Sequence, residues 1–295
     1  MKKKILLTGG SGFVGKNILE SYLAEKYEII APPRTELNLF DEDSVDEFFL
    51  NKKFDIIIHA ACKPGHRNAK DLSKLYCSNT KMFFHLVKHS DKFERMINLG
   101  SGAIYDNKNY KPKMKEEYFG QNIPQDEHGF CKYVTGKYIL QFDKVVDLRI
   151  FGLFGKYEDY AIRFISNAIC KTLFDLPITI KQNRKFDYVY INDLMPVLEH
   201  FIENKPKYNA YNVTPDESIE LYELVEKIRE ISDKNLSIIV KEEGLGLEYS
   251  GDNSLLKNEI KNLKFTEIDK AIKELYEWYN QNHRIINKDC LLLDK

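Results

Sequence analysis

The sequence lacks the features that would indicate a membrane protein, a nucleic-acid-binding protein or a metalloprotein. It has no apolar run of about 18 residues, the length that a membrane-spanning helix requires. The basic start of the chain is followed by an apolar stretch too short for a signal peptide. The formal net charge is −1, so no basic excess favours nucleic acid or an anionic membrane as a partner. The five cysteines show no CxxC or Cys/His ligand spacing, so we expect reduced thiols, a cytoplasmic location and no metal site.

The composition that remains is that of an ordinary globular protein of 295 residues, long enough for one large domain or two closely joined ones. In the first half, short apolar runs alternate with segments of helical period. Residues 56–58 are apolar throughout, as in a strand that is covered on both faces. This pattern predicts an α/β fold with a doubly wound parallel sheet. We assign residues 1–155 and about 186–204 to the sheet domain, and residues 156–185 and 205–295 to a smaller α/β substrate domain.

A glycine-rich turn follows the first predicted strand. Residues 8–15 read TGGSGFVG, with the glycines spaced as TGxxGxxG between a strand and a helix. The first glycine allows a tight turn, the second lets the backbone approach a pyrophosphate, and the third lets the helix pack closely on the strand. Free N–H groups at the helix start would then bind the anion. We therefore predict a Rossmann domain that binds a dinucleotide through Thr8, Gly9, Gly12, Phe13, Val14 and Gly15.

The residues after the second predicted strand indicate which dinucleotide binds. A carboxylate at this point would pair with the ribose hydroxyls of NAD, but the sequence reads Ala31-Pro32-Pro33-Arg34. A guanidinium binds a 2′-phosphate with two hydrogen bonds, whereas a carboxylate would repel it. We therefore favour NADP over NAD, with Arg34 at the phosphate. The alternative is that Arg34 is a solvated loop residue and that Glu36 reaches the ribose.

Several short segments match the motifs of one enzyme family. They are TGGSGFVG (8–15), RTELNLFDEDSV (34–45), HAACKPG (59–65), Asn79, LGSGAIY (99–105), LRIFGLFG (148–155) and FDYVYINDL (186–194). Through them the chain resembles the extended short-chain dehydrogenase/reductases, or NAD-dependent epimerases/dehydratases, and above all the GDP-L-fucose synthase branch. The resemblance implies a homodimer joined through two long helices of each subunit. It also implies further cofactor contacts at Ala60, Ala61, Lys63, Asn79, Leu99, Lys132 and Phe151.

Members of this family transfer hydride with a Ser or Thr, a Tyr and a Lys, and the last two are spaced YxxxK on one helix face. Ser101 occupies the first position. The family segment PxxxYGxSK reads PQDEHGFCK here, which puts His128 at the Tyr position and Lys132 at the Lys position. The alternative register is the literal YxxxK formed by Tyr133 and Lys137.

A histidine at the position of the family tyrosine changes the chemistry. An imidazole reaches less far than a phenol, and the neighbouring Lys132 should favour the neutral form of His128. A neutral imidazole still donates one N–H, and its ordinary pKa of about 6.5 suits proton transfer near neutrality. We expect His128 to serve as acid/base or as a hydrogen-bond donor, with Tyr105 as a substitute proton donor. The alternative is a regulatory protein that keeps the dinucleotide fold and has lost turnover.

The resemblance also narrows the class of reaction, because two sets of catalytic residues found in relatives are missing from this chain. A 4,6-dehydratase carries an Asp-Glu pair after the Ser, and a GDP-L-fucose synthase carries an epimerisation Cys where this chain has Ala103. Hydride transfer at a sugar carbonyl remains, as in a 4-keto-sugar reductase or a 4-epimerase. The family's second domain closes over the diphosphate of a nucleotide-linked sugar. We expect Asn167, Lys171 and Arg184 to bind this substrate, the alternative being that they are solvated surface residues.

Overall fold

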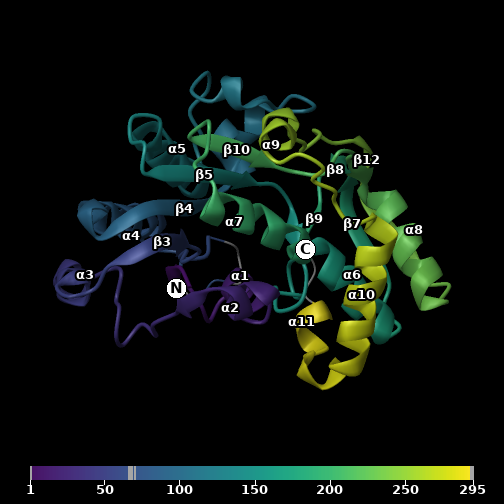
Figure 1. Ribbon diagram of the computed structural model, residues 1–295. Coiled ribbons are helices and arrows are strands. Elements are labelled where there is room, and N and C mark those ends of the chain that lie inside the picture. The colour runs from purple at the N-terminus through teal and green to yellow at the C-terminus, as the bar shows by residue number, and fades with distance from the viewer. Residues whose placement is uncertain (1, 66–68, 70, 293–295) are drawn as a thin grey trace.

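A six-stranded parallel sheet forms the centre of the molecule (Figure 1). The computed structural model describes residues 2–65, 69 and 71–292. Every neighbouring pair of strands in this sheet runs parallel, which confirms the predicted α/β fold of Rossmann type. The strands are β1 (Lys4–Thr8), β2 (Glu28–Ile30), β3 (Phe54–His59), β4 (Phe93–Ser101), β5 (Val145–Ile150) and β10 (Ala210–Val213).

The strand order decides where a ligand can bind. The order is β10-β5-β4-β3-β1-β2, so the chain goes from β1 to one edge and then returns to β3 on the other side of β1. Open α/β sheets bind ligands at such a switch point, outside the carboxyl ends of the strands. Thr8 and His59 pair at the ends of β1 and β3, and they mark this position.

Helices cover both faces of the sheet because successive side chains of a strand point to opposite faces. Leu6 and Ile57 face one cluster of helices, whereas Ile5, Leu7 and Ile58 face the other. Burial on both sides explains why the β3 sequence is apolar at successive positions. One face is covered by α3 (Glu42–Phe49), α4 (Leu75–Lys88) and α5 (Glu127–Ile139), the other by α1 (Phe13–Leu19), α2 (Tyr22–Lys26) and α7 (Leu194–Glu203).

A smaller part of the chain lies to one side of the sheet, drawn in green and yellow beside the teal α6 and β7 in Figure 1. Its helices share one continuous hydrophobic cluster with the sheet, through residues such as Ile150, Ile169, Leu224 and Ile272. This shared core fixes the smaller part against the carboxyl ends of the strands. Its elements are α6 (Phe164–Leu173), α8 (Leu221–Ser232), α9 (Ser254–Glu259), α10 (Ile268–Gln281) and α11 (Asp289–Leu292), with the strand pairs β6 (Leu153–Phe154) and β9 (Val189–Tyr190), β7 (Ile178–Asn183) and β12 (Ile238–Leu245), and β8 (Lys185–Phe186) and β11 (Ile219–Glu220).

The structure places β10 in the central sheet, although the sequence predicts a substrate domain for all of residues 205–295. A strand of four residues carries too little periodicity to be recognised as the partner of β5. After α1 the chain begins a second helix, α2, because Ser21 caps it by accepting a hydrogen bond from the Leu23 N–H.

Thr266 lies just before the last long helix, α10. The cap of α10 is Glu267. Thr266 instead donates its N–H and its hydroxyl to the two carboxylate oxygens of Asp193, at 2.9 and 2.6 Å. The threonine therefore ties the start of α10 to the segment that leads into α7.

Two absences hold for the described residues. None of the described helices is both long and apolar enough to span a membrane. Within residues 2–65, 69 and 71–292, no three His, Cys, Asp or Glu side chains are grouped as a metal site requires.

The turn after β1 brings α1 very close to the strand. Gly9 has a φ of +74°, and the Gly12 N–H donates to the Gly9 carbonyl at 3.0 Å. A Cβ built on Gly15 would lie 2.2 Å from the Gly9 oxygen, and one built on Gly9 would lie 2.7 Å from the Ala61 nitrogen. Glycine is required at both positions because backbone atoms leave no room for a side chain.

We predict that Gly15→Ala destabilises the protein by about 1–3 kcal/mol, because the added methyl group meets backbone that cannot move aside. Urea unfolding without cofactor measures the effect. Ser11→Ala, at an exposed position of the same turn, is the control. Equal stability of the two variants would contradict the close packing described above.

Candidate active site

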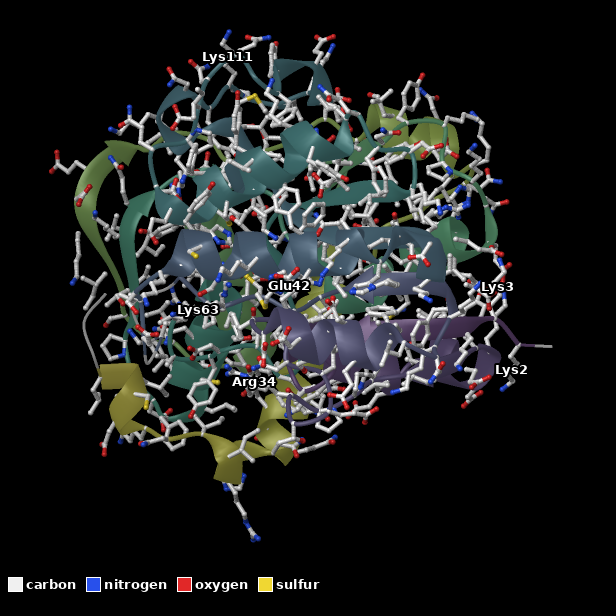
Figure 2. The ribbon with its side chains drawn as sticks, turned by 90° about the vertical axis from the view of Figure 1, so that its left-hand side faces the viewer. Lys2, Lys3, Arg34, Glu42, Lys63 and Lys111 are labelled. Carbon is white, nitrogen blue, oxygen red and sulfur yellow. The ribbon has the colours of Figure 1, made fainter. Side chains whose placement is uncertain are left out.

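A cavity of about 560 Å³ begins at the glycine turn and follows the carboxyl ends of β1, β2 and β3. Its walls include Thr8 and the glycines of the turn at one end and Arg34 at the other. In Figure 2, Arg34 and Lys63 lie well away from Lys2 and Lys3, which mark the opposite ends of the strands. Phe13 and Val14 are half-buried at the start of α1. The shape and the free N–H groups at the start of α1 fit an elongated dinucleotide.

Arg34 is the exposed cation at the far end of this cavity. Its guanidinium lies over the Phe40 ring at 4.7 Å, and its Nε donates to Asn38 at 3.3 Å. Glu36 is exposed and is paired with Lys52 at 3.3 Å, outside the cavity wall. The structure therefore places a guanidinium in the wall of this cavity, whereas the alternative carboxylate lies outside it.

The segment after β3 forms the second wall of the cavity. Ala60, Ala61 and Cys62 line it. The Ala61 N–H donates to the Thr8 hydroxyl at 3.3 Å. Asn79 from α4 accepts from the Lys63 N–H at 2.7 Å and donates to the Lys63 carbonyl at 3.1 Å. Asn79 thus holds this wall in place through a backbone contact, which its sequence motif alone did not reveal.

The end of β4 brings Ser101 close to the first turns of α5. Lys132 donates to the Leu99 carbonyl at 3.0 Å. A Cβ built on Gly129 would lie 2.8 Å from the Ala103 carbonyl oxygen, so α5 begins directly against the turn that follows Ser101. His128 and Lys132 are one helical turn apart and interact electrostatically. The register with His128 and Lys132 therefore places both beside the end of β4.

His128 is held in its neutral form. Burial, followed by the positive charge of Lys132, lowers its pKa from 6.5 to about 4. Its Nδ1 atom is buried and has no hydrogen-bond partner. An imidazole of this kind donates or accepts a hydrogen bond at neutral pH, but it carries no proton ready for release.

Tyr133 and Tyr105, the two tyrosines considered above as proton donors, face other parts of the fold. Tyr133 packs on Phe119, and Lys137 is exposed beside the same ring, so the literal YxxxK pair faces that ring. The Tyr105 hydroxyl donates to Asn212 at 2.6 Å and accepts from Arg149 at 2.8 Å. The structure therefore corrects the expectation for Tyr105: its buried hydroxyl is held within the fold and is not offered to a substrate.

A second cavity, of about 740 Å³, lies in the smaller part of the chain, where β6, α6 and β7 contribute to its walls. Asn167, Arg163 and Arg184 line it. The Asn167 amide donates to the Tyr160 carbonyl at 3.0 Å. Lys171 is buried behind the wall and donates to Thr179, a lining residue, at 2.9 Å. The predicted substrate residues thus divide into two that face the cavity and one that supports it.

Glu158 lies in the wall of the same cavity and is unusual in being a buried carboxyl group. Ser166 donates to one of its oxygens, and the other oxygen has no partner. Burial raises the pKa of Glu158 to about 8, so the group is largely protonated at neutral pH.

The sequence alone did not point to Tyr249, and it assigned no role to Arg163. Tyr249 reaches the end of β4 from the smaller part of the chain: its hydroxyl lies where a Cβ on Gly102 would be 2.6 Å away. No motif marks it, because it is remote in sequence from Ser101. Arg163 was noted among several cations, and the structure places its charge close enough to affect both His128 and Tyr249.

The sequence matches the NAD-dependent epimerase/dehydratase family over residues 5–214, so the chain belongs to that family. This confirms the predicted family and the predicted enzyme class. The chain therefore stands among the reductases, epimerases and dehydratases of nucleotide-linked sugars.

Among similar curated proteins, a GDP-L-colitose synthase of Yersinia pseudotuberculosis is 24% identical over 226 residues, covering 69% of this chain and 73% of the relative. A GDP-L-fucose synthase of Azorhizobium caulinodans is 34% identical over 107 residues, covering 35% of this chain and 34% of the relative. These matches confirm the resemblance to the GDP-L-fucose synthase branch.

Solved structures share the fold at low sequence identity. A GDP-mannoheptose C4 reductase from Campylobacter jejuni, solved with NADP bound, superposes with a TM-score of 0.80 at 20% identity and covers 95% of this chain and 98% of that one. A UDP-glucose 4-epimerase from Thermotoga maritima, solved with UDP-glucose, has a TM-score of 0.80 at 18% identity and covers 95% and 99%.

We predict that Glu158→Gln makes stability less sensitive to alkaline pH. The raised pKa means that the folded protein holds a proton between pH 4.5 and about 8 that the unfolded chain releases, so this contribution to stability is lost as the pH rises through 8. Gln cannot ionise and keeps an acceptor for Ser166. Urea unfolding at about pH 5 and about pH 9 should show a smaller loss for the variant than for the wild type. Glu242→Gln, at an exposed position of the same cavity, is the matched control, and parallel losses in all three proteins would contradict the assignment.

Proposed function

We propose that this protein is an NADP-dependent reductase of a 4-keto sugar linked to a nucleoside diphosphate. The observation that carries the proposal is the presence of two cavities, one along the carboxyl ends of β1, β2 and β3 and one in the smaller part of the chain. The first runs from the glycine turn to Arg34, and the second is rimmed by Arg163 and Arg184. Ser101, His128 and Lys132 stand at the end of β4 and the start of α5.

The choice of NADP follows from the residues present. The open N–H groups of the glycine turn suit the pyrophosphate. The Arg34 guanidinium, which lies over the Phe40 ring, suits a 2′-phosphate. The reductase of similar fold from C. jejuni was solved with NADP bound, which agrees with this choice. Bound NADPH would supply the hydride.

The residues of the chain would then act on the substrate oxygen. Ser101 donates a hydrogen bond to the carbonyl oxygen as charge develops there. Neutral His128 adds a second donor at shorter reach than the family phenol. Lys132, fixed by the Leu99 carbonyl, would hold the nicotinamide ribose and stabilise negative charge.

The second cavity accounts for the nucleotide-sugar class. Two guanidiniums in its wall can neutralise a diphosphate, and Asn167 of α6 lines the same cavity. The aromatic rings of Tyr188 and Phe186 give this cavity a partly apolar lining that suits a base or a sugar.

Turnover with NADPH tests the proposal directly. GDP-, UDP- and dTDP-linked 4-keto-6-deoxyhexoses are supplied in turn, and both NADPH oxidation and the reduced sugar are measured. We expect reduction of at least one of them. Ser101→Ala should lower kcat about 100-fold, because a hydroxyl that stabilises the developing charge is lost.

A protein that binds NADPH tightly in calorimetry but reduces none of these sugars would favour the second candidate, a regulatory dinucleotide-binding protein. The specific observation behind that candidate is the loss of the family tyrosine at position 128. Failure to bind NADPH at all would overturn both.

We predict that Arg34→Ala weakens NADPH binding about 10- to 100-fold while NADH binding changes little, because a charge-assisted hydrogen bond to the 2′-phosphate is lost. Calorimetry with each cofactor measures the difference. Glu36→Gln, whose carboxylate is paired with Lys52, should leave both affinities unchanged. A larger effect of Glu36→Gln on NADH would instead assign the ribose contact to Glu36.

We further propose a cytoplasmic homodimer that is joined through α4 and α5. These two helices pack on each other, and Tyr76 stacks on Phe130 across them at 5.0 Å with Phe130 left 37% exposed. Sedimentation of the purified protein measures the oligomeric state.

A further inference from the structure

The family places its proton-donating tyrosine on α5, where this chain has His128. Among the described residues, the phenol of Tyr249 lies beside Ser101 instead. Tyr249 follows β12 in the smaller part of the molecule. Its hydroxyl presses against Gly102, the residue after Ser101, and glycine is needed there because a Cβ would lie 2.6 Å from the phenol oxygen. Ser101 is the neighbour in sequence of the glycine against which the Tyr249 hydroxyl packs, and it affects the pKa of that phenol.

The Tyr249 ring is held firmly in this position. It stacks on Phe186 at 4.6 Å and packs on Tyr110 and Phe151 at 4.8 and 5.0 Å. The backbone is fixed as well, because the Tyr249 N–H donates to the Lys185 carbonyl and its carbonyl accepts from the Asp187 N–H, both at 3.0 Å. A ring fixed by three aromatic neighbours and two backbone bonds is a pre-organised donor and not a mobile surface residue.

The position of the ring also suits a substrate. Phe186 contacts the Tyr249 ring on one side and lines the large cavity on the other. A sugar carbonyl that approaches Ser101 from this cavity would therefore meet the Tyr249 hydroxyl at the end of β4. Tyr105 and Tyr133 offer no competing hydroxyl there, for the reasons given above.

We propose that Tyr249 is the catalytic proton donor of this enzyme and acts together with Ser101 in place of the family tyrosine. This inference rests on the proposed reductase function. Hydride from NADPH forms the new C–H bond and leaves NADP⁺, while the electron pair of the carbonyl moves to its oxygen. The Tyr249 O–H bond breaks and its proton goes to that oxygen, which becomes the product hydroxyl. The phenolate stays beside Ser101 and takes a proton from water after the product leaves.

The chemistry of the group agrees with this role. Burial raises the pKa of Tyr249 to about 12, and hydrogen bonds from Tyr110 and Ser101 oppose part of that rise. Such a phenol keeps its proton until a strongly basic alkoxide develops beside it. Burial lowers the pKa of His128 to about 4, so at neutral pH it is a neutral imidazole, whose remaining N–H is a much weaker acid than an imidazolium.

The test compares Tyr249→Phe, Tyr133→Phe and wild type with NADPH and the 4-keto-6-deoxyhexose that the wild type reduces. Phe keeps the aromatic packing and removes only the hydroxyl. We expect kcat to fall about 100-fold or more in Tyr249→Phe, since general acids contribute roughly 10²–10⁴-fold. KM, NADPH affinity by calorimetry and the unfolding temperature should stay unchanged. Tyr133→Phe should behave like the wild type.

A rescue experiment separates a chemical role from a structural one. Adding His128→Tyr to Tyr249→Phe restores a phenol at the family position beside Lys132, and kcat should recover by at least about tenfold. Wild-type kcat in Tyr249→Phe would overturn the inference alone. The inference would also fall if Tyr249→Phe were slow but bound NADPH weakly or unfolded at a lower temperature. It would fall as well if His128→Tyr did not restore kcat in that variant. If the wild type reduced none of the supplied sugars, the proposed function would fall and this inference with it.

Discussion

The close approach of α1 to the end of β1 is the constraint on which the rest of the site depends. Backbone atoms of Gly9, Gly15 and Ala61 lie so near one another that no side chain fits between them. This contact aims the N-terminus of α1 at the switch point between β1 and β3, where the sheet opens a crevice. The cofactor groove, its wall after β3 and the position of Arg34 all follow from that placement.

The site is completed by two parts of the chain that share one core. The sheet and α5 supply Ser101, His128 and Lys132 at one edge, and the smaller part supplies the cavity wall and Tyr249. Because a single hydrophobic cluster runs through both parts, their relative position is set by packing as well as by the connecting loops. A phenol from the smaller part can therefore be held against a serine of the sheet.

Burial determines the charge state of several groups around these cavities. It keeps His59 and His128 neutral by lowering the pKa of each, to about 3 and about 4. It keeps Glu158 protonated by raising its pKa. These side chains are thus neutral at neutral pH, and the positive charges of Lys132 and Arg163 lie near His128. This distribution suits a reaction in which negative charge develops on one oxygen and a diphosphate lies nearby.

The sequence by itself determined the α/β class, the glycine turn and the cation at position 34, because each depends on local spacing along one strand or turn, and the register of His128 and Lys132 stays a prediction. The short β10, the break after α1 and the tie between Thr266 and Asp193 were beyond it, since they depend on contacts between distant segments. The tertiary structure alone decided that the Tyr105 hydroxyl is held by Arg149 and Asn212, and that Tyr249 stands beside Ser101. Which hydroxyl reaches the substrate is set by how two parts of the chain pack together, and no periodicity or motif records that packing.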